Sequence, residues 1–149
     1  MPSVLVIHGP NMNLLGTREP EIYGSVTLDQ LNEQLRGLAD ELQLSVDIIQ
    51  TNSEAEIVSA IQNAMGSYAV IILNPAGLTH TSVSIRDAIA ACGVPTIECH
   101  VSNPYRRALT EPFRATSMTA PACAGVIAGF GTASYLIALH AARMLAEEV

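Results

Sequence analysis

The sequence alternates short, mostly apolar runs with longer amphipathic segments, and this alternation limits the possible folds more than any other feature. The apolar runs span residues 4–8, 44–50, 69–73, 94–99 and 125–128. Segments of helical periodicity lie between most of them and after the last, at 27–42, 53–66, 82–91 and 133–148. Apolar strands that alternate with helices predict a parallel sheet covered on both faces.

We therefore expect one α/β domain over residues 1–149. Five strands joined by right-handed crossovers favour a flavodoxin-like, three-layer α/β/α fold, with a five-stranded parallel sheet in the order 2-1-3-4-5. Ligands of such folds bind beyond the carboxyl ends of the strands, near the first and third. The loops after His8, Leu73 and Glu98 meet there and are rich in Asn, His, Arg and Tyr.

The sequence predicts where two helices begin. Thr27 is a plausible N-cap for a helix that turns leucines 28, 31, 35, 38 and 42 to one face. The Ser53-to-Glu56 spacing is that of a capping box, and it predicts a second helix that points Ile57, Ile61 and Met65 inward and ends at Gly66. The stretches 11–26 and 100–124 carry no such pattern and are expected to be irregular.

Charge and residue usage exclude several classes of function. Seven arginines face 14 acidic residues, a net charge of −7, which argues against binding nucleic acid. The chain has no lysine, so Schiff-base catalysis, a Walker-A loop and a pyridoxal-phosphate site are excluded.

The three cysteines, at 92, 99 and 123, do not suggest a disulfide framework and indicate a reducing, cytoplasmic setting. No apolar run approaches the roughly 18 residues of a membrane span, so no membrane partner is expected.

The loop after the first strand holds a possible general base. Arg18 and Tyr23 are five residues apart, and a guanidinium beside a phenol favours the phenolate. The alternative is that Tyr23 only packs its ring while Arg18 is solvated.

The loop after the third strand offers polar groups at the same sheet edge. Asn74 supplies an amide donor and acceptor, and Ser82 opens a helix whose N–H groups can receive an anion. Turn and capping chemistry accounts for Ser82 equally well, but accounts less well for His80.

The end of the fourth strand holds a possible general acid. Glu98 and His100 lie on the same side of the strand, so the carboxylate can orient the imidazole and keep it protonated. A purely structural pair is the alternative. A metal site is not expected, because neither C-x-x-C nor H-E-x-x-H spacing is present.

Four segments carry a family resemblance: residues 9–20 with Tyr23-Gly24, residues 74–88, residues 98–103 and residues 125–131. Together they resemble the type II 3-dehydroquinate dehydratases over nearly the whole chain. The resemblance implies a flavodoxin-like subunit in a homo-oligomer, usually a dodecamer of trimers. It also implies a reaction without metal or cofactor, the anti elimination of water from 3-dehydroquinate through an enolate to 3-dehydroshikimate. That reaction serves aromatic amino acid biosynthesis by the shikimate pathway or quinate breakdown.

The resemblance also assigns catalytic roles. Tyr23, activated by Arg18, removes the proton beside the ketone, and the loop at 18–23 closes as a lid. Asn11 stabilises the enolate oxygen through a water, and His100, held by Glu98, protonates the departing hydroxyl.

Substrate binding is implied for the remaining matched positions. The backbone N–H groups of Val101 and Ser102, with the Asn74 amide, hold the substrate carboxylate. His80 and Arg114 hold the ring hydroxyls, and Asp87 reaches in from a neighbouring subunit.

The chain departs from the family pattern at residues 104–110. About three extra residues follow Asn103, and Thr110 stands where an arginine is usual, with Arg107 at a shifted position. One alternative function is therefore dehydration of a related cyclic hydroxy-keto acid, with recognition altered by this insertion. Another is a non-catalytic flavodoxin-like binding module.

Overall fold

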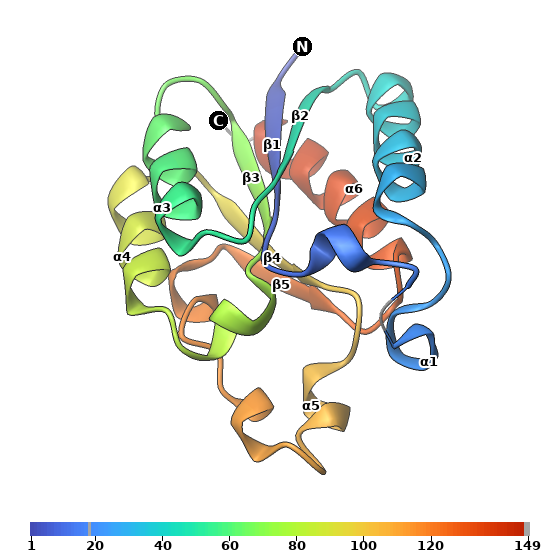
Figure 1. The fold of residues 1–149 in the computed structure, drawn as a ribbon. Helices are drawn as coiled ribbons and strands as arrows, with labels where there is room; N and C mark the ends of the chain where they lie inside the picture. Colours follow the sequence, from blue (N-terminus) through green and yellow to red (C-terminus); the bar gives the residue numbers. More distant parts are fainter. Residues whose placement is uncertain (18, 148–149) are drawn as a thin grey trace.

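A computed structural model describes residues 1–17 and 19–147. A parallel sheet runs through the centre in the order β2-β1-β3-β4-β5 (Figure 1), which confirms the predicted flavodoxin-like topology. The strands are β1 Ser3–His8, β2 Ser45–Gln50, β3 Val70–Asn74, β4 Thr96–His100 and β5 Gly125–Ala128.

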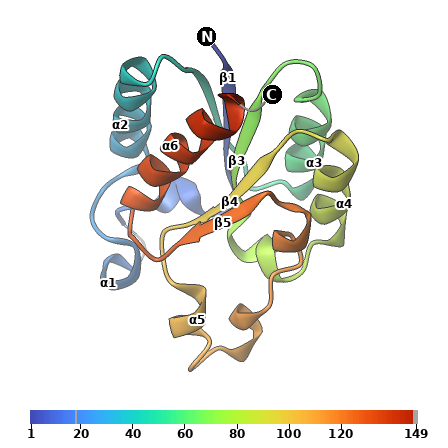
Figure 2. The ribbon, with the colours of Figure 1, turned by 180° about the vertical axis from the view of Figure 1, so that it is seen from behind.

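Four helices make the two outer layers. Helices α2 (Leu28–Glu41) and α6 (Ala133–Glu147) cover one face of the sheet, and α3 (Glu54–Asn63) and α4 (Val83–Cys92) cover the other (Figures 1 and 2). Two separate apolar cores result, one on each side of the sheet. The predicted end of the last helix, at residue 148, lies outside the described residues.

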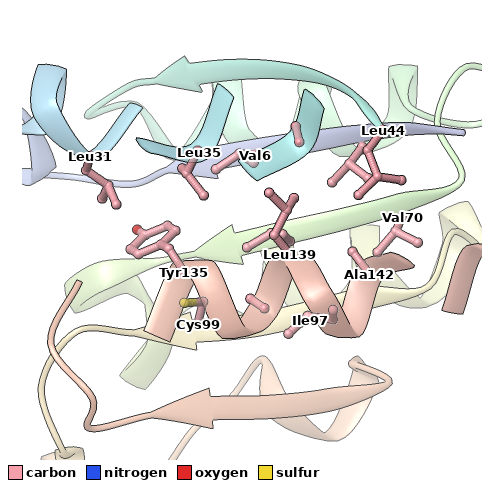
Figure 3. Packing of buried hydrophobic residues seen from close by; sticks show 14 of the residues in the cluster. Val6, Leu31, Leu35, Leu44, Val70, Ile97, Cys99, Tyr135, Leu139 and Ala142 are labelled. Carbon is pink, nitrogen blue, oxygen red and sulfur yellow. The ribbon is translucent and has the colours of Figure 1, made fainter. Parts of the chain in front are cut away.

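The core under α2 and α6 follows the predicted leucine face. Leu31 and Leu35 of α2 are fully buried against Val6 of β1 and Leu139 of α6 (Figure 3). Tyr135 of α6 is buried among them, with its ring turned toward α2 (Figure 3). The hydroxyl of a buried tyrosine needs a hydrogen-bond partner. The partner of Tyr135 is a residue of the functional site.

The two predicted helix starts form. The Thr27 hydroxyl accepts from the Gln30 N–H at 3.2 Å, and the Gln30 side chain returns to the Thr27 N–H at 3.0 Å. Ser53 caps α3 by accepting from the Glu56 N–H at 3.2 Å. The Glu56 carboxylate, however, accepts from the Thr51 hydroxyl, whose oxygen receives the Ser53 N–H. The Glu56 side chain therefore does not bond the Ser53 N–H directly, as in a capping box, because the Thr51 hydroxyl lies between these two groups.

The predicted inward position of Met65 is wrong. Ile57 and Ile61 are buried as expected, but Met65 is 58% exposed. Helix α3 ends at Asn63, and Ala64, three residues after Ile61, takes the next inward position. Residues three or four apart share a helix face only while the helix continues.

The two stretches expected to be irregular contain short helices. Residues 11–26 include a 3₁₀ turn at Met12–Leu14 and helix α1 at Pro20–Tyr23. Residues 100–124 include helix α5 at Pro104–Arg107 and 3₁₀ turns at Pro112–Ala115 and Ala120–Ala122. The α5 segment extends away from the sheet, beyond the carboxyl ends of the strands (Figure 1). Within residues 1–17 and 19–147, no helix combines the length and hydrophobicity needed to cross a membrane.

Candidate active site

A pocket opens at the carboxyl edge of the sheet, where the topology predicted a ligand site. Most of the predicted site residues line it, namely Asn11, Tyr23, Asn74, His80, His100, Val101, Ser102 and Arg114. Arg107, which the sequence did not assign to the site, lines it as well. Glu98 lies behind His100, and Arg18 lies outside the described residues.

Strand register brings these residues together. His8, the last residue of β1, is the partner of Asn74, the last residue of β3. Leu73 of β3 is in turn the partner of Glu98 on β4. The chain turns immediately after β1 at Gly9, whose N–H donates to the Asn74 carbonyl at 2.8 Å. A Cβ at this position would lie 2.6 Å from that carbonyl oxygen, so the close approach requires glycine.

Glu98 and His100 form the predicted pair at the end of β4. His100 Nε2 donates to Glu98 Oε2 at 3.0 Å, and both side chains are buried. The intervening residue, Cys99, points to the opposite face and packs in the core under α6. Because Glu98 occupies Nε2, Nδ1 is the imidazole nitrogen left to exchange a proton with a ligand.

Two further hydroxyls hold Glu98. Ser117 donates to its carboxylate at 3.1 Å, and Thr119, which is fully buried, donates to Oε1. Burial raises the pKa of Glu98, but the hydrogen bonds from His100, Thr119 and Ser117 outweigh burial and bring the pKa below its usual value. The sequence did not predict either contact, because Ser117 and Thr119 follow Glu98 by 19 and 21 positions and no local pattern links residues so far apart.

Tyr23 contacts an arginine that the sequence did not pair with it, and the predicted partner, Arg18, lies outside the described residues. The Tyr23 hydroxyl accepts from Arg107 Nη1 at 2.6 Å, and the Arg107 guanidinium carbon lies 5.4 Å from the centre of the Tyr23 ring. Arg107 belongs to α5, within the segment that departs from the family pattern. The only sign of this contact in the sequence was that Arg107 is shifted from the position where the family pattern has an arginine.

Two residues that line the pocket have a left-handed backbone conformation. Asn11 has φ 70° and Ala76 has φ 53°. Asparagine tolerates this conformation, whereas alanine is strained in it by about 1–2 kcal/mol. The Asn74 side chain helps to hold Ala76, because Asn74 Oδ1 accepts from the Ala76 N–H at 2.9 Å.

His80 and Arg114 lie side by side with Phe113. His80 Nδ1 donates to the Thr116 carbonyl at 2.8 Å, which leaves Nε2 of the neutral ring as an acceptor. Arg114 pairs with Glu111 at 3.1 Å, and its guanidinium lies 4.8 Å from the Phe113 ring centre. The insertion therefore leaves both a histidine acceptor and an arginine donor at the pocket.

Asp87 lies apart from this pocket, exposed on α4. Its predicted contact with the site of a neighbouring subunit stays a prediction. Among the described residues, no three His, Cys, Asp or Glu side chains are clustered as metal ligands are.

Comparison with known proteins gives consistent matches. The family model described as dehydroquinase class II matches residues 2–143. A 3-dehydroquinate dehydratase from Acaryochloris marina is 52% identical over 94% of this chain and 92% of its own length. One from Geotalea daltonii is 53% identical over 93% and 94%. The crystal structure of a type II dehydroquinase from Butyrivibrio crossotus superposes with a TM-score of 0.91 at 37% identity, covering 95% of this chain and 97% of that one.

Proposed function

The chain belongs to the class II dehydroquinase family and is a hydro-lyase that dehydrates 3-dehydroquinate to 3-dehydroshikimate, and we propose that Tyr23 is its general base and His100 its general acid. One observation carries this assignment. A tyrosine hydroxyl hydrogen-bonded to an arginine and a histidine hydrogen-bonded to a buried carboxylate line the same pocket.

Proton removal begins the reaction. The Tyr23 phenolate takes the proton from the carbon beside the ketone, and the carbon–hydrogen electron pair forms an enolate. Arg107 donates to the Tyr23 oxygen at 2.6 Å, so a positive charge lies beside the atom that acts as the base in this proposal. Arg18 supplies a second positive charge in this proposal. The Asn11 amide stabilises the enolate oxygen through a water molecule as negative charge develops there.

Loss of water completes the reaction. The enolate electrons form the carbon–carbon double bond and the carbon–oxygen bond breaks. His100 donates its Nδ1 proton to the departing hydroxyl, which leaves as water. Glu98 supports this step because its carboxylate stabilises the protonated imidazole. Solvent then reprotonates His100 and removes the proton that Tyr23 gained. Base and acid belong to different elements, α1 and β4, and the proposed anti elimination needs them to act on opposite faces of the substrate.

The remaining pocket groups hold the substrate in this proposal. The N–H groups of Val101 and Ser102 and the amide of Asn74 bind its carboxylate. His80 accepts a hydrogen bond from one ring hydroxyl, and Arg114 donates to another. These side chains suit their partners, because the amide and the guanidinium are donors and His80 keeps one ring nitrogen for a ligand.

We also propose a homo-oligomer, a dodecamer built from trimers, in which Asp87 completes the site of an adjacent subunit. The exposed position of Asp87 on α4 is compatible with such a contact. Apolar side chains exposed on and just after edge strand β5 support burial between copies, since Val126 is 49% and Phe130 is 63% exposed. Native mass spectrometry is expected to give twelve times the subunit mass, and a monomer would refute the assembly.

A cytoplasmic location is proposed on the basis of the cysteines. Cys92, Cys99 and Cys123 are all free thiols, as is usual in a reducing compartment. Cell fractionation with an antibody against the native chain tests this.

A spectrophotometric assay tests the catalytic assignment. The conjugated enone of 3-dehydroshikimate absorbs in the ultraviolet, so turnover of 3-dehydroquinate is followed directly. Tyr23→Phe is expected to lower kcat by a factor of at least ~10², the lower end of what general base catalysis contributes. Tyr68→Phe is the matched control, because its hydroxyl bonds Asp47 near the opposite edge of the sheet. A Tyr23→Phe enzyme with near-native kcat would refute the role of Tyr23.

A further inference from the structure

A buried polar chain runs from the pocket into the core beneath it. Asn74 Nδ2 donates to the Tyr135 hydroxyl at 2.9 Å, and that hydroxyl lies 3.0 Å from His8 Nδ1. On its other side His8 Nε2 lies 2.8 Å from Asn32 Oδ1 on α2. Tyr135 and His8 are fully buried, and neither lines the pocket. The proposed reaction uses neither.

The direction of every bond in this chain is determined. Asn74 Oδ1 accepts from the Ala76 N–H, so Nδ2 must be the donor to Tyr135. At the other end of the chain Asn32 presents the acceptor Oδ1, which requires the hydrogen of the neutral His8 ring on Nε2, so Nδ1 carries none and accepts from the Tyr135 hydroxyl. His8 Nε2 then bears the hydrogen and donates to Asn32. Each group in the chain can therefore act toward its neighbour only as a donor or only as an acceptor, and the chain of hydrogen bonds ends at the Ala76 N–H.

Burial favours the protonation states that this direction needs. It lowers the pKa of His8 to about 4, although the bond to Asn32 opposes the shift. It raises the pKa of Tyr135 well above the ordinary value, so the hydroxyl keeps its hydrogen. At neutral pH both groups are uncharged.

One N–H of Asn74 remains available to a ligand. Its Nδ2 group carries two hydrogens, and Tyr135 receives one of them. The other points toward Met12 Sδ at 3.3 Å, and a thioether is a weak acceptor. Both Asn74 and Met12 line the pocket, so a carboxylate oxygen there can replace the sulfur.

We propose that Tyr135 and His8 are positioning residues for substrate recognition, because they fix the Asn74 amide so that one N–H faces the substrate carboxylate. This inference rests on the proposed role of Asn74 in binding that carboxylate. The carboxylate takes no part in bond breaking, so the contact is equally strong in the ground state and the transition state. Losing it raises KM and leaves kcat unchanged.

A double-mutant cycle tests the proposal with 3-dehydroquinate as substrate. Tyr135→Phe removes only the hydroxyl and is expected to raise KM by about tenfold, the factor that one hydrogen bond to a charged group provides, with kcat nearly native. Asn74→Ala is expected to raise KM at least as much. The double variant is expected to match Asn74→Ala, because Tyr135 acts only through Asn74. Tyr68→Phe, which loses a hydroxyl remote from the site, is expected to keep the native KM.

Different results would refute different claims. An unchanged KM in Asn74→Ala would refute the binding role of Asn74 and with it this inference. A raised KM in Asn74→Ala, together with effects that multiply in the double variant, would refute the inference alone. A native KM in Tyr135→Phe would do the same.

Nitrogen NMR of the wild-type imidazoles tests the chain without any substitution. The sequence contains only four histidines, so assignment is practical. His8 is expected to keep Nδ1 unprotonated and Nε2 protonated at pH 5.5, because its pKa of about 4 keeps the ring neutral there. A proton on His8 Nδ1 would reverse the chain and overturn the proposal, even if Tyr135→Phe failed to fold.

Discussion

Thr119→Val tests whether buried hydroxyls hold Glu98 ionised. The two side chains have nearly the same shape, so the change removes one donor to the carboxylate and little else. Glu98 is 1% exposed and Thr119 is fully buried, so water cannot replace the lost bond. A hydrogen bond to a buried charged group contributes about 1.5–3 kcal/mol, and we expect the free energy of unfolding at pH 7 to fall by that amount.

The loss depends on pH in a defined direction. The pKa of Glu98 in the folded chain lies below its ordinary value of 4.5, so its carboxylate contributes stability above that value. This contribution disappears as the pH falls through the folded pKa. Once the carboxyl is protonated, Thr119 makes only a neutral hydrogen bond, worth about 0.5–1.5 kcal/mol. The effect of Thr119→Val is therefore largest at neutral pH and about halved in acid.

Urea unfolding monitored by circular dichroism measures both values. Protein concentration is held constant, because assembly would add to the apparent stability. Thr81→Val, at an exposed threonine, is the control and is expected to change stability by less than about 0.5 kcal/mol. A loss at pH 7 below that value would refute the reasoning. A loss equal at both pH values would show that Thr119 contributes packing rather than charge stabilisation.

Three further predictions follow from the site. Arg107→Met removes the guanidinium that donates to Tyr23 and is expected to lower kcat at least ~10-fold. Arg106→Met, at an exposed neighbour, is the control and is expected to keep kcat native. Equal effects of the two substitutions would refute a specific contact between Arg107 and Tyr23. Gly9→Ala places a Cβ 2.6 Å from the Asn74 carbonyl oxygen and is expected to lower stability by about 1–3 kcal/mol in thermal unfolding; an unchanged Tm would contradict this packing. Treatment with EDTA is expected to leave kcat unchanged, because the proposed base, acid and charge-stabilising groups are all side chains; a loss restored by added metal would refute that.

Local patterns were sufficient to predict the sheet and the pair on β4. Apolar runs and caps predicted five parallel strands in the observed order, and the period of two along a strand placed Glu98 beside His100. Met65 was predicted wrongly because the helical period says where a side chain would point but not where the helix ends. Helix ends depend on turn geometry, which a hydrophobic period does not contain.

Partners distant in sequence were beyond such patterns. Arg107 contacts Tyr23 from 84 positions away, a distance that no local pattern bridges, and the predicted pairing of Tyr23 with Arg18 lies outside the described residues. Likewise, nothing around Glu98 indicates that Thr119 donates to it. Each of these contacts depends on how the 100–124 segment returns across the sheet edge, a path that only tertiary structure defines.

Strand parity explains why Asn74 and His100 are held by different layers of the fold. Along β3, Val70 and Ile72 face the α2 and α6 layer, so Asn74 faces it too and meets Tyr135 there. Along β4, Cys99 faces that same layer, so Glu98 and His100 face the other side and meet the segment that carries Thr119. The proposed carboxylate donor and the proposed acid thus lie over opposite faces of one sheet edge, each fixed by its own buried network. A one-residue shift in β4 would bring Cys99 to the pocket and turn His100 into the core under α6, so the register of a single strand decides whether this edge can hold an acid at all.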